Sequence, residues 1–194
     1  MKSYTILPAD GRTPYTMQVD EVMWLPDADI RMQARLSYDA QALYVSMRAW
    51  ERDIRAELTE PMSPVWEDSC MELFFAPGED GRYFNLEVNP KGCYYLGFGR
   101  GRDDRVRLFP EDTAAFAIQT DRLPDGWTLS YRVPHAFLQL FYPGFRFEAG
   151  REMRANVYKC GDKTAQPHYL AWNALRSDKP DFHRPEDFGL LCFG

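Results

Sequence analysis

Hydrophobic and polar positions alternate along three neighbouring stretches of the chain between residues 70 and 98. Side chains of a β-strand point to opposite faces in turn, so alternation with a period of two predicts three strands. One face of these strands is apolar and is expected to enter the core; it comprises Met71, Leu73, Phe75, Phe84, Leu86, Val88, Tyr94, Leu96 and Phe98. The residues between them form a second face, which we expect to be an open sheet surface.

This second face collects side chains suited to directional hydrogen bonding and stacking, namely Glu72, Asn85, Glu87, Asn89 and Tyr95. Carboxylates and amides make directional hydrogen bonds, and aromatic rings stack on apolar surfaces. The simpler interpretation is that these residues form the solvated face of an antiparallel sheet, because such faces are polar in most proteins. The set as a whole favours a binding surface.

Turn residues separate further strand patterns along the rest of the chain. Asn89-Pro90-Lys91-Gly92 predicts a tight turn that makes the second and third strands antiparallel neighbours, and Leu123-Pro124-Asp125-Gly126 predicts a second hairpin. Only residues 134–140 favour a short helix, because proline suits a first helical turn. The remaining strands are expected at residues 30–38, 42–50, 115–120, 127–133, 152–158 and 168–172. Many short strands joined by Pro- and Gly-rich turns predict an all-β fold, a β-sandwich of two antiparallel sheets.

Composition narrows the class of protein. The chain has 194 residues, of which 45% are hydrophobic and 15% aromatic, so it is long and apolar enough to fold as one domain over residues 1–194. The net charge of −6 argues against a nucleic-acid partner, whose phosphates require clustered Lys and Arg. A local basic run alternates with Asp103 and Asp104 and is expected to be a solvated loop; it comprises Arg100, Arg102, Arg105 and Arg107.

The expected location of the chain follows from its N-terminus and its cysteines. No stretch approaches the ~18 consecutive apolar residues of a membrane span, and the first residues lack the apolar core of a signal peptide. As written, the sequence predicts a cytoplasmic protein without a membrane partner. The four cysteines, Cys70, Cys93, Cys160 and Cys192, have no metal-ligand spacing and are expected to be reduced, small apolar side chains unless the protein is exported.

Several separated motifs together resemble the carbohydrate-binding module family 9-like domains. Trp66 leads into the strand that carries Glu72, residues 83–92 read YFNLEVNPKG, Trp172 comes late in the chain, and residues 182–191 read FHRPEDFGLL. The resemblance covers most of the chain, from about residue 43 to the C-terminus. It implies a non-catalytic β-sandwich that binds the ends of polysaccharide chains or small sugars, often as part of a carbohydrate-active enzyme.

The resemblance also implies roles for individual residues. In the family two aromatic rings clamp a sugar, so Trp66 and Trp172 are the candidate walls, and Glu72 is the carboxylate that reads sugar hydroxyls. Asn89 matches an Arg-x-Asn pair of the family, whereas Glu87 replaces its arginine and exchanges a donor for an acceptor. The remaining donors are expected from Arg154 or Asn156. A mono- or oligosaccharide is the expected ligand.

A glycoside hydrolase is one alternative, because Glu72 and Glu87 lie on one face and two carboxyl groups are what glycoside hydrolysis requires. Two points count against it. An open sheet face desolvates an acid poorly and so raises its pKa little, and the chain has no nucleophile motif.

The sequence is also compatible with a haem-binding or protein-interaction sandwich. His183 and Met71 are candidate iron ligands, although Met71 lies on the core face by alternation, and His135 and His168 have no ligand spacing with His183. No cofactor is expected. Structural calcium fits the resemblance, with Asp27 and Asp29 or Asp103 and Asp104 as oxygen clusters, but no calcium-binding loop motif occurs and no ligand set follows.

Overall fold

The computed structural model describes residues 1–26 and 28–194, and in this part of the chain 14 strands pack as a β-sandwich with one short helix. The strands span Ser3–Pro8 (β1), Met17–Val19 (β2), Glu21–Val22 (β3), Arg31–Tyr38 (β4), Ala42–Trp50 (β5), Cys70–Ala76 (β6), Tyr83–Val88 (β7), Tyr94–Gly99 (β8), Arg105–Arg107 (β9), Gln119–Leu123 (β10), Gly126–Pro134 (β11), Glu152–Cys160 (β12), Tyr169–Ala171 (β13) and Gly189–Phe193 (β14). One sheet has the strand order β10-β11-β5-β4, with β2 also paired to β4. The other has the order β14-β12-β6-β7-β8-β9, with β13 paired to β12 and β3 to β13.

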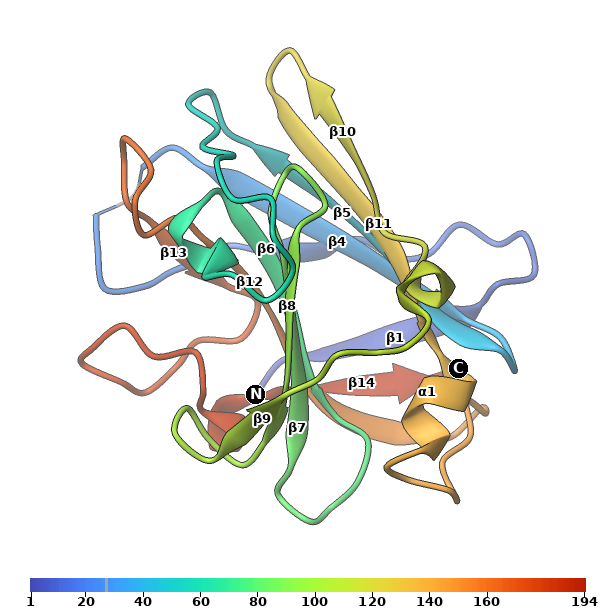
Figure 1. Cartoon of the computed structure of the whole chain (residues 1–194). Coiled ribbons are helices and arrows are strands. Elements are labelled where there is room, and N and C mark those ends of the chain that lie inside the picture. Colours follow the sequence, from blue (N-terminus) through green and yellow to red (C-terminus); the bar gives the residue numbers. More distant parts are fainter. Residues whose placement is uncertain (27) are drawn as a thin grey trace.

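Strand β1 joins the two sheets, which the prediction of two purely antiparallel sheets did not include. Its first four residues, Ser3 to Ile6, pair in parallel with β14, and Leu7 and Pro8 pair in parallel with β4. Figure 1 shows β1 in blue beside the red β14. The β-sandwich prediction is confirmed. The two layers are connected through the N-terminal strand β1 and the C-terminal strand β14.

Most predicted elements are confirmed within one or two residues. The helix α1 spans His135–Gln139, and three 3-10 turns span Val65–Glu67 (η1), Thr113–Phe116 (η2) and Pro185–Asp187 (η3). The strand predicted at 115–120 is wrong in its start, because η2 ends at Phe116 and β10 begins at Gln119. The short edge strands β2, β3 and β9 and the terminal strands β1 and β14 were not predicted. No helix in the described residues is long and apolar enough to cross a membrane.

The predicted turn after β7 is present and depends on its glycine. The Gly92 amide donates to the Asn89 carbonyl oxygen at 2.9 Å, and Gly92 adopts a φ of 74°. This left-handed backbone suits glycine, which has no Cβ to clash. The turn sets β7 and β8 antiparallel, with Val88 opposite Tyr94 and Glu87 opposite Tyr95.

The hairpin between β10 and β11 brings its glycine against β5. A Cβ built on Gly126 would overlap the Ala49 carbonyl oxygen. We expect Gly126→Ala to destabilise the fold by about 2 kcal/mol, since overpacking costs ~1–3 kcal/mol, and to lower Tm by roughly 4–8 °C. Thermal unfolding measures this. Gly101→Ala is the control, because a Cβ there meets nothing within 4 Å; equal stability of the two variants would contradict the prediction.

A buried ionic cluster lies where β5 ends and β12 ends. Lys159 is fully buried, and its Nζ lies 3.1 Å from Glu51 Oε2 and 2.7 Å from His168 Nε2. Glu51 also accepts hydrogen bonds from Ser69 Oγ at 2.6 Å and Trp127 Nε1 at 3.2 Å. Burial and the Lys159 charge lower the pKa of His168 to about 4. Although burial opposes ionisation of Glu51, Lys159 and Ser69 hold the pKa of this carboxyl below its ordinary value.

Candidate ligand-binding pocket

A pocket of about 150 Å³ lies on the face of the β6–β7–β12 sheet that carries Glu72 and Glu87. Three strands provide its floor: β6 places Glu72 and Phe74, β7 places Glu87 opposite Glu72, and β12 places Cys160. The rest of the lining comes from loops and short elements, namely Trp24, Trp66, Arg102, Arg105, Asp162, Tyr169, Pro180, Asp181, Phe182 and His183.

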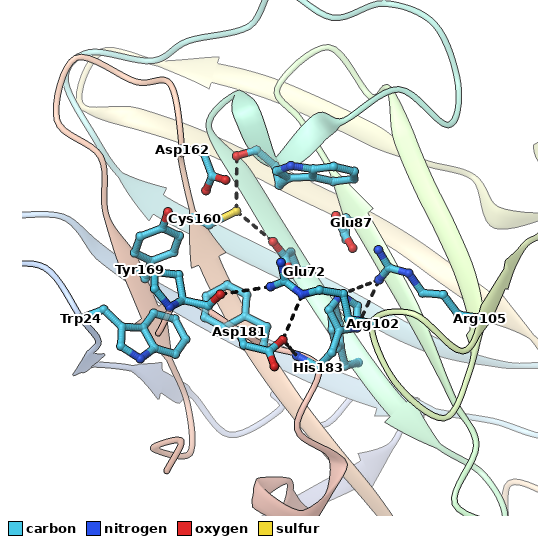
Figure 2. A pocket seen from close by; sticks show the side chains of 14 residues that line it. Trp24, Glu72, Glu87, Arg102, Arg105, Cys160, Asp162, Tyr169, Asp181 and His183 are labelled. Atoms are coloured by element: carbon cyan, nitrogen blue, oxygen red, sulfur yellow. Dashed lines mark hydrogen bonds and ion pairs between the residues drawn. The ribbon is translucent and has the colours of Figure 1, made fainter. Parts of the chain in front are cut away.

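Aromatic side chains form part of the wall. Trp66, in η1, is half-buried and meets Tyr95 edge-on, with ring centroids 5.5 Å apart. Trp24 packs edge-on against Tyr169 and tilted against Phe182, with centroids 5.4 Å apart in both pairs. Its indole Nε1 donates to the Ser177 carbonyl oxygen at 2.6 Å. Figure 2 shows Trp24 and Tyr169 together on one side of the pocket.

The opposite side of the pocket carries two arginines and a histidine (Figure 2). Arg102 Nε donates to Asp181 Oδ1 at 3.2 Å, and its NH2 donates to the Pro180 carbonyl oxygen at 3.1 Å. Arg105 contacts the His183 ring and lies 5.1 Å over the Tyr95 ring. These contacts tie residues 180–183 to the loop and strand that follow β8. The prediction that the basic run is only a solvated loop is wrong for Arg102 and Arg105, which line the pocket.

Burial controls the charges of the floor. Glu72 and Glu87 are only 2% and 3% exposed. Burial, and then the neighbouring Glu87, raise the pKa of Glu72 well above its ordinary value. Burial also raises the pKa of Glu87 to about 7, although Arg105 and the Asn85 amide favour its ionised form. The expectation that this face desolvates an acid poorly and raises its pKa little is therefore wrong.

The face is covered because the C-terminal segment crosses it. The Phe182 ring stacks on Tyr158 with centroids 4.0 Å apart, and Tyr158 Oη donates to the Phe182 carbonyl oxygen at 3.1 Å. Phe188 packs edge-on against Tyr83, whose Oη lies 2.7 Å from His183 Nδ1. The prediction of an open sheet surface is therefore wrong. The physical reason is that aromatic side chains on the polar face pack against the C-terminal segment, which covers them.

The predicted polar residues of β7 and β8 divide into different roles. Asn85 is buried, and its Nδ2 donates to Glu87 Oε1 at 2.8 Å, so it orients a floor carboxyl without lining the pocket itself. Asn89 bonds to Asp68 Oδ2 at 2.9 Å and to the Leu58 carbonyl oxygen at 2.8 Å, and it fixes the turn after β7. Tyr95 is buried behind Trp66 and Arg105.

Like Asn85, Asn89 and Tyr95, three further predicted site residues lie outside the pocket lining. Arg154 NH2 donates to the Phe188 carbonyl oxygen at 2.6 Å, and Asn156 Nδ2 donates to the Asn173 carbonyl oxygen at 2.8 Å; both side chains hold the C-terminal segment. Trp172 is only 4% exposed, and a Cβ on Gly189 would lie 2.6 Å from its ring. The structure therefore does not pair Trp172 with Trp66 across this pocket.

Several lining residues were missed because they come from separate loops and short elements. Trp24 lies far in the sequence from Asp162, Tyr169 and Asp181, and these residues meet only in the folded chain. A backbone hydrogen bond between distant residues joins Asp162 to the wall, because its amide donates to the Trp66 carbonyl oxygen at 3.0 Å. A sequence clue was available for the cover: Phe74 and Tyr83 fall on the polar face, and large aromatic side chains are seldom left in water.

The candidate haem ligands do not meet in the structure, and the candidate calcium clusters are described only in part. Met71 is fully buried on the face of β6 opposite to Phe74, whereas His183 packs against Phe74, so these two residues do not meet at one iron. Asp103 and Asp104 are exposed, and the Asp27 part of the other cluster lies outside the described residues. In the described part of the chain one group of three donors gathers, Cys70, Glu72 and Cys160, all of them buried.

Together, the sandwich and its polar, aromatic-walled pocket define a small-ligand-binding β-sandwich domain. The sequence profile of carbohydrate-binding family 9 matches residues 9–193, so the chain belongs to this family. The resemblance found in the sequence is thereby confirmed. A comparison with curated proteins found no match.

Solved structures share the fold. A "putative carbohydrate-binding protein" from Bacteroides uniformis is 25% identical, with a TM-score of 0.84 over 100% of this chain and 99% of the other. A family 9 module from Caldicellulosiruptor kristjanssonii, in complex with glucose, is 14% identical with a TM-score of 0.71 over 100% and 96% of the two chains. In complex with cellotriose, a family 9 module from this organism is 12% identical with a TM-score of 0.68 over 99% and 93%.

Proposed function

We propose that this chain is a non-catalytic sugar-binding module whose pocket holds one sugar ring. The observation that carries the proposal is the combination of aromatic walls with a floor of carboxyl groups in one pocket. A pyranose has apolar C–H patches on its faces and hydroxyl groups around its rim. Stacking on aromatic rings and hydrogen bonds to carboxyl groups are therefore complementary to it. Family membership and the glucose and cellotriose complexes of similar folds support this proposal.

Within this proposal Trp66 provides the principal stacking surface, and Trp24 and Tyr169 replace Trp172 as its aromatic counterparts. Glu72 and Glu87 form hydrogen bonds with sugar hydroxyl groups at the floor of the pocket. Glu87 accepts hydrogen bonds where the family's arginine would donate them, so the sugar must offer a hydroxyl hydrogen at that edge. Arg102 and Arg105 supply donors from the opposite side.

The size of the pocket limits the ligand. Its volume of about 150 Å³ is below the ~300–1,000 Å³ of pockets for drug-sized molecules. One ring fits, and further rings of an oligosaccharide extend into solvent. We expect cellotriose and glucose to bind with Kd values within about threefold of each other, a difference of ~0.7 kcal/mol.

Isothermal titration calorimetry with a panel of monosaccharides, cellobiose and cellotriose tests the proposal. We expect saturable binding of at least one sugar with a stoichiometry of one. No heat of binding across the panel, with the protein folded by circular dichroism, would overturn the proposed function. A strong increase in affinity from glucose to cellotriose would instead indicate an extended binding surface and contradict the one-ring pocket.

Glycoside hydrolysis remains a second candidate, favoured by one observation: Glu72 and Glu87 lie opposite each other on neighbouring strands, and both are buried in the pocket. Two carboxyl groups on one face are the minimum requirement for a glycosidase. Incubation with cellotriose followed by chromatography of the products distinguishes the two functions. The binding module returns the trisaccharide intact, whereas release of glucose that stops in Glu72→Gln would establish catalysis.

A further inference from the structure

Two strands bring two thiols and a carboxyl group together beneath the pocket. Cys70 and Glu72 are on β6, and Cys160 on β12 is the direct cross-strand partner of Cys70. The ligand atoms of these three residues all lie within 4.8 Å of one another. Cys160 Sγ donates to Glu72 Oε1 at 2.9 Å. Cys70 and Cys160 are 0% and 2% exposed, so the cluster is shielded from bulk water.

From this arrangement we propose that Cys70, Glu72 and Cys160 form a binding site for a thiophilic divalent cation, with zinc as the best fit. Sulfur ligands select zinc over calcium and magnesium, which take oxygen ligands. Tetrahedral zinc has Zn–S and Zn–O distances of ~2.3 and ~2.0–2.2 Å. Donor atoms around one such ion therefore lie about 3.5–4 Å apart, which small side-chain rotations of this cluster achieve.

The surroundings leave a place for both the positive charge and a fourth ligand. Neither Glu72 nor Glu87 forms an ion pair with Lys, Arg or His in the described residues. Glu87 is the cross-strand partner of Glu72, is buried, and accepts one hydrogen bond, from Asn85. Arg105 attracts both carboxyl groups electrostatically but forms no ion pair with either. Burying ionised carboxylates without a directly paired cation is costly. A divalent cation would supply that direct contact, with Glu87 or a water molecule as the fourth ligand.

The ion also has a path to the site. Glu72 and Cys160 line the pocket, so their ligand atoms are reached from its interior (Figure 2). Cys70 completes the set from behind them and does not line the pocket. The metal site shares Glu72 with the proposed sugar pocket. It rests on the positions of the three donors and requires no sugar to bind, so its experiment can fail or succeed independently of sugar binding.

Cobalt titration of the full chain, purified under reducing conditions and freed of metal, tests this site. Cobalt bound by thiolates in a tetrahedral site has charge-transfer and visible absorption bands. We expect these bands to saturate at one cobalt per chain and to disappear when zinc is added. Cys70→Ser and Cys160→Ser are each expected to lose the thiolate bands. Glu72→Gln is expected to weaken cobalt binding at least tenfold, by ~1.4 kcal/mol or more.

Cys192→Ser is the matched control, because Cys192 lies on β14 away from the cluster and should keep the full spectrum. Circular dichroism of each variant confirms that it is folded. Absence of thiolate bands in the folded wild-type chain would overturn the proposal, as would bands that persist in both Cys70→Ser and Cys160→Ser. A thiol assay in denaturant and a metal chelator that finds two thiols missing in the purified protein would also overturn it, in favour of a Cys70–Cys160 disulfide.

Discussion

Trp66→Ala is expected to weaken sugar binding about 30-fold while leaving the fold intact. The Trp66 ring is half-buried in the pocket wall, so part of its surface is available to a ligand. Stacking a sugar ring on this indole buries on the order of 80 Å² of apolar surface, which stabilises the complex by about 2 kcal/mol, or roughly 30-fold in Kd. Calorimetric titration of the best sugar of the panel measures the change.

Trp50→Ala is the matched control for this prediction. Trp50 is also half-buried, but it lies at the end of β5, beneath Arg48 and outside the pocket lining. Its replacement should leave the Kd unchanged. Trp24→Ala is expected to weaken binding by a smaller factor than Trp66→Ala, because Trp24 is already packed on Tyr169 and Phe182. Equal affinities of wild type and Trp66→Ala would remove Trp66 from the site.

Local patterns in the sequence predicted the strands, their turns and the family, because these features depend on neighbouring residues. The alternation in β6 and β7 identified Glu72 and Glu87 as side chains of one face, and the structure places both in one pocket. The turn at residues 89–92 followed from the conformational preferences of proline and glycine. Edge strands of two or three residues are too short to show a period of two, so β2, β3 and β9 were missed.

The cover of the sheet depends on contacts between distant residues, and the alternation pattern does not contain them. All six residues of β7 are buried, because one face packs into the sandwich and the C-terminal segment crosses the other. For the same reason Asn156 and Arg154 hold this segment, although the sequence suggested that they face a ligand. Their amide and guanidinium groups fit either role, and only the fold distinguishes them.

The buried Lys159–Glu51 pair also escaped prediction, since no local rule brings residues 51 and 159 together. Breaking it is expected to have the largest effect on stability of any single change discussed for this chain. Glu51→Leu leaves the Lys159 ammonium group buried without its carboxylate and deprives Ser69 and Trp127 of an acceptor. Removing one partner of a buried pair costs ~3–5 kcal/mol, which corresponds to a Tm roughly 10 °C lower for a chain of this size.

Urea unfolding monitored by circular dichroism tests this prediction with two comparisons. The Arg48–Asp125 pair has a similar separation, 3.0 Å against 3.1 Å, but its side chains are 36% and 55% exposed. Asp125→Asn should therefore cost less than ~1 kcal/mol, because water screens an exposed pair. The double variant Glu51→Leu with Lys159→Met should recover part of the loss, since no unpaired charge remains buried. A Glu51→Leu variant that is no more destabilised than Asp125→Asn would contradict the prediction. That result would mean that the buried pair does not stabilise the sandwich, and that the distance between two charges matters more here than their burial.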